Sequence, residues 1–201
     1  MESFTVKKLF VLIITIMLLC SACAQASVDY EAIYNEYMNS GAWNPGVGYV
    51  IEESEIIDIN NDGVPELLLY TKNSESWERV SQFCSIKNGR VEALLEGYDC
   101  GGTAGGDEVI VMYDTKTSKY VVGTTGIING YNRCTSWNEL YNYSKGELIR
   151  VTKYSWDLEY FDPDYHFGDD PGITVYKIDD KQVTQEEYEA VFSRFVEREN
   201  S

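Results

Sequence analysis

Residues 55–71 read EIIDINNDGVPELLLYT, and this stretch decides the fold. Two apolar runs, 55–59 and 67–71, enclose a polar segment that contains Asp62, Gly63 and Pro65. Short runs rich in aliphatic and aromatic residues are typical of β-strands, and Gly and Pro between them mark a turn. The stretch therefore predicts two strands joined by a tight polar loop.

The same pattern continues to residue 155. Short runs rich in β-branched and aromatic residues alternate with turn signals such as Asn88-Gly89, and Asn-Gly between two such runs is a strong hairpin signal. No long helical pattern separates the runs, which argues against a parallel α/β sheet. We therefore predict an antiparallel β-meander with strands at 55–59, 67–71, 80–87, 91–96, 108–113, 119–124, 136–143 and 148–155.

Helical spacing replaces this pattern at both ends of the meander. On the N-terminal side, apolar residues recur at helical spacing from Tyr30 to Met38, and Gly41 ends the segment. On the C-terminal side, Thr184 and Glu187 have the spacing of a capping box. The apolar stripe that follows comprises Tyr188, Val191, Phe192, Phe195 and Val196. The predicted fold class is α+β: an antiparallel β-meander with an N-terminal and a C-terminal helix.

The loop between the first two strands carries the sharpest chemical motif. Oxygen-bearing groups alternate along it: Asp58, Asn60, Asp62, the backbone carbonyl of Val64, and Glu66. A hard cation such as Ca²⁺ takes roughly six to eight oxygen ligands, and alternate residues of a tight loop can point inward together. We therefore expect a structural Ca²⁺ site here, and the alternative is a polar hairpin turn without a metal.

The first residues of the chain differ in composition from the rest. Lys7 and Lys8 precede an apolar run, Leu9 to Leu19, that is too short to span a bilayer, for which about 20 residues are needed. A charged start, a short apolar core and then small residues are typical of a secretory signal peptide. We therefore expect residues 1–22 to be removed on export.

The segment Leu19-Cys20-Ser21-Ala22-Cys23 resembles the bacterial lipobox, although Cys20 stands where Leu is usual. The resemblance implies that Cys23 is diacylated, and two acyl chains anchor a protein stably to a membrane. It thus implies a lipidated tether, 23–28, a single globular domain, 29–201, and a location on the extracytoplasmic face of the cell membrane. The alternative is cleavage after residue 24 or 26, which would release a soluble protein.

The calcium loop also resembles those of known families. Asp58–Glu66 is similar to the first half of an EF-hand loop, but Leu69 stands where that family has a bidentate Glu. The flanking strands make the loop more similar to the calcium loops of FG-GAP or VCBS-like β-repeats. Still more similar are uncharacterised lipoproteins of Gram-positive bacteria (Firmicutes), which join a lipobox, one such loop, a β-meander and a C-terminal helix that begins like Val183–Tyr188. This resemblance implies secretion and a Ca²⁺ site, and it implies no known activity.

Charge and cysteine usage restrict the partners. A net charge of −17 at pH 7 argues against binding of nucleic acid. The glycine-rich stretch 101–106 lacks the lysine of a P-loop, so no nucleotide is expected. Besides Cys23, the exported chain would keep Cys84, Cys100 and Cys134. An exported compartment permits a disulfide, and Cys100 with Cys134 is the pair we expect.

A second acidic region, 157–170, follows the meander. We interpret it as a solvated acidic loop. The alternatives are a second cation site and a carboxylate pair for glycoside hydrolysis. The chain has a single histidine, His166, and no serine-nucleophile motif accompanies it. We therefore expect a calcium-stabilised lipoprotein that acts as a binding or interaction module for a protein or glycan ligand, without catalytic activity. The alternative is a carboxylate-dependent glycan hydrolase that uses the 157–170 region.

Overall fold

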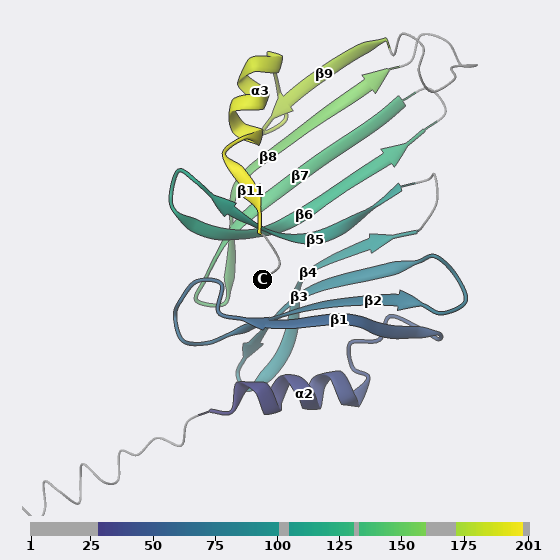
Figure 1. Ribbon diagram of the computed structural model, residues 1–201, viewed down its shortest axis with the longest axis vertical. Helices are drawn as coiled ribbons and strands as arrows, with labels where there is room; N and C mark the ends of the chain where they lie inside the picture. Colours follow the sequence, from purple (N-terminus) through teal and green to yellow (C-terminus); the bar gives the residue numbers. More distant parts are fainter. Residues whose placement is uncertain (1–27, 101–104, 131–132, 160–171, 199–201) are drawn as a thin grey trace, which may run out of the picture. The chain divides into compact units, whose positions relative to one another are not determined.

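The computed structural model describes residues 28–100, 105–130, 133–159 and 172–198. Ten strands of these segments follow one another in sequence order, each antiparallel to the next (Figure 1). They are β1 (Tyr49–Ile57), β2 (Glu66–Asn73), β3 (Arg79–Lys87), β4 (Arg90–Asp99), β5 (Gly105–Asp114), β6 (Lys119–Asn129), β7 (Arg133–Ser144), β8 (Glu147–Glu159), β9 (Ile173–Ile178) and β10 (Lys181–Val183). The predicted antiparallel meander with a helix at each end is confirmed.

Two-residue turns fix the register of the β3–β4 and β7–β8 hairpins. Asn88 and Gly89 join β3 to β4 with φ angles of 53° and 76°. Lys145 and Gly146 join β7 to β8 with φ angles of 53° and 78°. Positive φ at both central residues is what a type I′ turn requires, and the twist of that turn matches the twist of the flanking strands.

The sheet turns a corner between β4 and β5, which pair only at Asp99 and Gly106. Beyond that pair β5 crosses over the preceding strands, and the Val109 N–H donates to Ser81 Oγ of β3 at 2.7 Å. A Cβ atom on Gly97 of β4 would lie 2.7 Å from a backbone atom of β5, so glycine permits this approach. The corner divides the sheet into a first half-sheet, β1–β4, and a second half-sheet, β5–β10.

Three apolar clusters occupy the layers that this fold creates. The interior cluster lies between the half-sheets and comprises Ile59, Leu68, Phe83, Val109, Val122 and Tyr143. The outer face of the first half-sheet packs against α2 (Tyr30–Ser40), with Leu67 and Leu69 on the opposite face from Leu68. On the outer face of the second half-sheet, Val121, Leu140 and Tyr154 pack against Tyr188 of α3 (Gln185–Phe192).

The helices begin and end at the residues that favour these positions. Gly41, with φ 72°, follows the last residue of α2. The capping box of Thr184 and Glu187 is present at the start of α3. None of the helices in the described segments is long and apolar enough to cross a bilayer.

The predicted C-terminal helix was too long. α3 ends at Phe192, and the last two residues of the predicted stripe lie in β11 (Phe195–Glu197), which pairs with the edge of β5 that the corner leaves open. Phe195 is still buried, but Val196 is half exposed. The change of structure lets Arg194 form two hydrogen bonds with the buried carboxylate of Asp114, at 2.7 and 2.6 Å.

Candidate functional site

Strands β1 and β2 hold the predicted calcium loop at its two ends. The Asp58 carboxylate accepts hydrogen bonds from the backbone N–H groups of Asp62 at 3.0 Å and Gly63 at 2.8 Å. Asp62 accepts the Val64 N–H and the Asn60 side-chain amide, both at 2.9 Å. These contacts gather the predicted ligand side chains of the loop around its own backbone.

The surrounding fold fixes the shape of this loop. Asn61 and Gly63 adopt positive φ angles of 58° and 85°, which produce its sharp bend. Ile59 is 2% exposed and anchors the loop in the interior cluster. The Tyr34 hydroxyl of α2 donates to the Pro65 carbonyl at 2.8 Å. The loop is therefore held from both faces of the first half-sheet.

Glu66, the last predicted ligand, is a buried carboxylate with one free oxygen. Its side chain is 0% exposed, and Oε2 accepts the Ile59 N–H at 3.1 Å. Oε1 is buried without a hydrogen-bond partner. Burial raises the pKa of Glu66 to about 7; the negative charges of Asp62 and Asp58 act in the same direction, and the Ile59 N–H opposes the rise.

The donor set suits a hard cation, although the acidic side chains are not drawn together around one point. In the described part of the chain, no three His, Cys, Asp or Glu side chains form a group that could hold a metal ion. A carboxylate has about four acceptor positions, and hydrogen bonds occupy two on each of Asp58 and Asp62. The remaining positions and Glu66 Oε1 can accept a cation. Leu69, at the position of the bidentate Glu of an EF-hand, has an aliphatic side chain packed in the cluster with α2 and supplies no oxygen.

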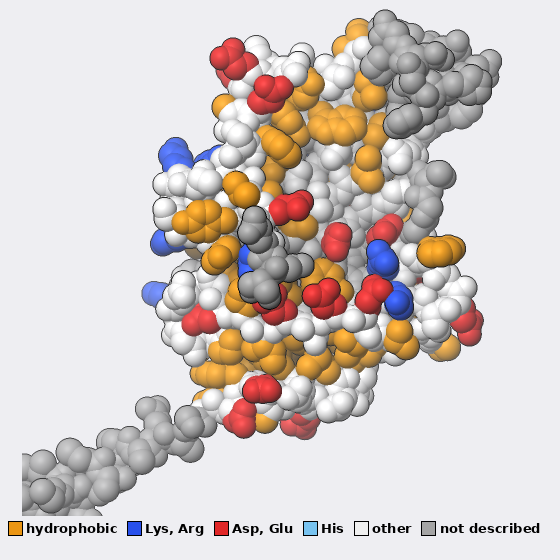
Figure 2. All heavy atoms as spheres, viewed as in Figure 1, with side chains coloured by type: hydrophobic (Ala, Val, Ile, Leu, Met, Phe, Trp, Pro, Cys, Tyr) orange, Lys and Arg blue, Asp and Glu red, His pale blue; other side chains and the backbone are white. Residues whose placement is uncertain are grey.

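A cleft of about 440 Å³ lies between the two half-sheets. Its apolar floor includes Leu68, Val80 and Val109. Its polar lining includes Tyr70, Arg79 and Arg198 together with the carboxylates of Glu52, Glu53, Glu55, Asp99, Asp107, Glu108 and Glu197. Figure 2 shows acidic and basic side chains together across the middle of the face viewed.

The carboxylates of the cleft come from strands far apart in the chain. Burial, with smaller contributions from the charges of Glu108, Glu53 and Glu55, raises the pKa of Tyr70 to about 12, and all four residues line the cleft. Sequence reasoning missed the cleft. Acidic residues do recur in 52–55 and 107–108, but nothing local predicts the corner that brings β5 over the first half-sheet.

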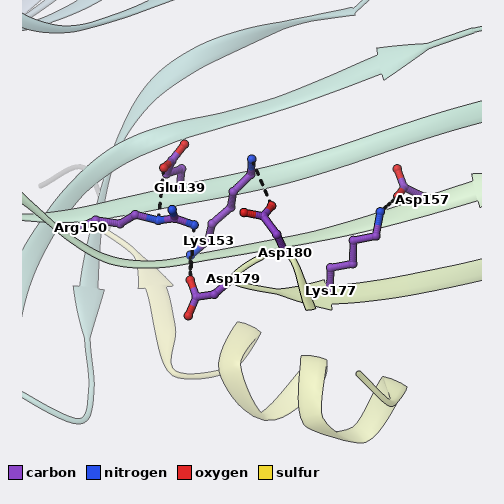
Figure 3. A network of polar contacts seen from close by, with 7 residues as sticks. All are labelled: Glu139, Arg150, Lys153, Asp157, Lys177, Asp179 and Asp180. Atoms are coloured by element: carbon purple, nitrogen blue, oxygen red, sulfur yellow. Dashed lines mark hydrogen bonds and ion pairs between the residues drawn. The ribbon is translucent and has the colours of Figure 1, made fainter. Parts of the chain in front are cut away.

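Asp157, the first residue of the second acidic region, forms an ion pair with Lys177 of β9 (Figure 3). Asp157 lies in β8, is 5% exposed, and accepts hydrogen bonds from Lys177 at 2.6 Å and Thr135 at 2.6 Å. Arg133 forms an ion pair with it at 2.8 Å. Burial would raise the pKa of Asp157, but these three partners outweigh burial and lower it to about 2.

This pKa means that Asp157 cannot serve as a proton donor near neutral pH. Glu159 ends the same strand. The remaining residues of the predicted hydrolase region, Asp162, Asp164, His166, Asp169 and Asp170, lie outside the described residues, as do the predicted signal and Cys23.

The three cysteines of the described segments are free thiols. Cys100 donates to the Gly105 carbonyl at 3.0 Å, and Cys134 is buried in β7. Strands β5 and β6 lie between β4, which Cys100 follows, and β7. Three strand spacings are about 14 Å, whereas a disulfide needs Cα atoms within about 7 Å. The structure therefore does not bear out the predicted Cys100–Cys134 bridge.

Comparison with known proteins adds no further constraint: no family profile, no curated protein and no solved structure matches the chain.

Proposed function

We propose that this chain is a calcium-stabilised binding module, anchored by a lipid on Cys23 at the extracytoplasmic face of a cell membrane and without catalytic activity. The observation that carries the proposal is the buried Oε1 atom of Glu66, which has no hydrogen-bond partner and lies at the end of the loop that also carries Asp58 and Asp62. A buried acceptor without a partner is costly, and a bound cation would remove that cost.

Calcium fits the chemistry of this site. The residues that would hold it are Asp58, Asn60, Asp62, the carbonyl of Val64, and Glu66. Bound there, Ca²⁺ would offset two of the three negative charges of these carboxylates and tie the end of β1 to the start of β2. Extracellular modules bind Ca²⁺ with dissociation constants on the order of 10⁻⁴–10⁻³ M, so the site would fill outside the cell.

The cleft between the half-sheets supports the binding role. A concave surface with an apolar floor and a charged lining is the usual form of a ligand site, and its volume falls within the range of roughly 300–1,000 Å³ found for such sites. The anchor rests on the lipobox alone. We expect Cys23→Ser to abolish incorporation of labelled fatty acid and to release the chain from the membrane fraction. Incorporation by that variant would refute acylation at Cys23.

Thermal unfolding of the purified chain with and without calcium tests the metal site. With 10 mM Ca²⁺ we expect a gain of about 1.4–2.7 kcal/mol over EDTA, because the concentration would exceed the dissociation constant roughly 10- to 100-fold. Asp62→Ala should lose the gain. Glu92→Ala, at an exposed position of β4, should keep it. An unfolding midpoint that is the same in Ca²⁺ and in EDTA would refute the calcium site.

A further inference from the structure

The cleft between the half-sheets carries more negative charge than its own cations neutralise. Seven carboxylates line it, against two guanidinium groups, Arg79 and Arg198. Glu53 and Glu108, which lie on opposite half-sheets, and Glu197 of β11 form no ion pair with any of the described residues. The cleft is therefore a site of unbalanced negative charge between two low-dielectric walls, which focus the field on a cation.

A guanidinium group of the chain itself, that of Arg198, already lies in the cleft. Arg198 follows β11 on the second half-sheet and reaches across the cleft to Glu55 of β1. Both of its terminal nitrogens bind that carboxylate, with Nη1 at 2.8 Å from Oε2 and Nη2 on Oε1. This two-point contact spans 143 residues of sequence and shows that the cleft accepts a planar cation.

The contacts that bind Arg198 to Glu55 differ from the contacts that bind β11 to the sheet. β11 is secured upstream by Arg194, which binds Asp114 through two hydrogen bonds, and by its pairing with β5. The Arg198 side chain is 16% exposed and its partner Glu55 is 39% exposed, so this ion pair lies at the solvent boundary. Arg198 can thus leave Glu55 without release of β11.

We propose that the cleft binds a ligand that carries a guanidinium group, and that Arg198 is a built-in competitor for this site. The inference rests on the proposed binding role and names its ligand class, but it depends on neither the calcium loop nor the lipid anchor. The fork of a guanidinium matches a carboxylate in two-point geometry, as Arg198 and Glu55 demonstrate. Glu53 and Glu108 supply further charge, and the apolar floor receives the methylene stem of the ligand.

Calorimetric titration of the full chain with argininamide at low salt tests this proposal. We expect saturable binding that weakens as salt rises to 0.15 M, where the screening length is about 8 Å. Citrullinamide, the neutral isostere, should not bind. No saturable binding of argininamide, or equal binding of citrullinamide, would overturn the proposal.

Two variants test the roles of the residues. Arg198→Gln should tighten argininamide binding roughly two- to fivefold, the range expected for loss of a competing ion pair at a surface. Glu108→Gln should weaken argininamide binding by a similar factor. Glu92→Gln, at an exposed position of β4, should leave the affinity unchanged. Unchanged affinity in a folded Arg198→Gln protein would refute the competitor role. Should that variant fail to fold, the wild-type and Glu108→Gln titrations still decide whether the cleft binds the cation.

The source of the guanidinium is distinguished by an acetyl-Gly-Arg-Gly-amide peptide. Tighter binding of the peptide than of argininamide would identify a peptide ligand, and the reverse order would identify a small free cation. Titrations in both Ca²⁺ and EDTA separate this proposal from the proposed calcium site. A chain that responds to Ca²⁺ but not to argininamide overturns only the ligand class, and the opposite result overturns only the calcium site.

Discussion

Glu66 at the end of the calcium loop and Asp157 in β8 are both almost completely buried carboxylates, with 0% and 5% exposure. Lys177, Thr135 and Arg133 surround Asp157, and its pKa falls to about 2. Glu66 receives one backbone N–H, the charges of Asp62 and Asp58 add to the effect of burial, and its pKa rises to about 7. Two carboxylates that are both shielded from solvent thus have opposite pKa shifts.

This difference distinguishes Asp157, whose charge is balanced by cations of the chain, from Glu66, which has no cationic partner among the described residues. Burial disfavours the ionised form of either group, and only nearby donors and cations can reverse that effect. The second half-sheet provides them for Asp157 within the chain. The loop provides only one for Glu66, and the proposed Ca²⁺, with its charge and preference for oxygen, would supply the positive charge that the described residues do not.

The largest effect that we predict concerns acid unfolding. Asp157 has a lower pKa in the folded than in the unfolded chain, so its stabilisation is present above about pH 4 and is lost as pH falls towards 2. The loss should be about 2 kcal/mol. Urea unfolding at stepped pH would measure it. Asp157→Asn should flatten this part of the pH profile, and identical slopes in the two proteins would contradict the assigned pKa.

Much of the fold was predictable because its signals are local. The strand patterns, the Asn88-Gly89 turn and the capping box each depend on residues close in sequence. Each appears at or near its predicted position, although β1 covers Tyr49–Ile57 and not 55–59. The three short strands β9, β10 and β11 were missed. β11 forms because Arg194 binds Asp114 and because β5 has an open edge. Both contacts join residues about 80 positions apart in the sequence.

The candidate site was predictable in part for the same reason. The predicted ligands of the loop alternate within nine residues, so their chemistry is visible in the sequence. The orphan oxygen of Glu66 was not, because it follows from burial by the surrounding strands. The cleft was invisible because its two walls meet only after the corner between β4 and β5 forms.

The next largest effect is the loss of stability when Asp157 loses one of its partners. Lys177→Met should destabilise the chain by about 1–2 kcal/mol at pH 7, because Asp157 remains buried while Arg133 and Thr135 still bind it. Lys153→Met is the matched control on the neighbouring strand. Its partner Asp180 lies 3.7 Å away and is 71% exposed, so the change should cost less than about 0.5 kcal/mol. Equal losses in chemical denaturation would show that Asp157 does not depend on Lys177.

The smallest effect has the opposite sign and comes from the unsatisfied carboxylate. The folded pKa of Glu66 is raised, so in metal-free protein its contribution to stability is lost as pH rises through about 7. Glu66→Gln removes that charge while its amide oxygen can still accept the Ile59 N–H. The raised pKa corresponds to roughly 3 kcal/mol, but the new amide NH₂ is buried without a partner, so the net gain for the EDTA-treated chain at pH 8 should be about 1 kcal/mol. With 10 mM Ca²⁺ the order should reverse, because the wild-type chain gains from the metal and the variant lacks a charged ligand. Differential scanning calorimetry under both conditions would measure this crossing. A variant that is less stable than wild type in EDTA as well would mean that the Glu66 charge is satisfied within the chain, and the two carboxylates would then no longer differ in kind.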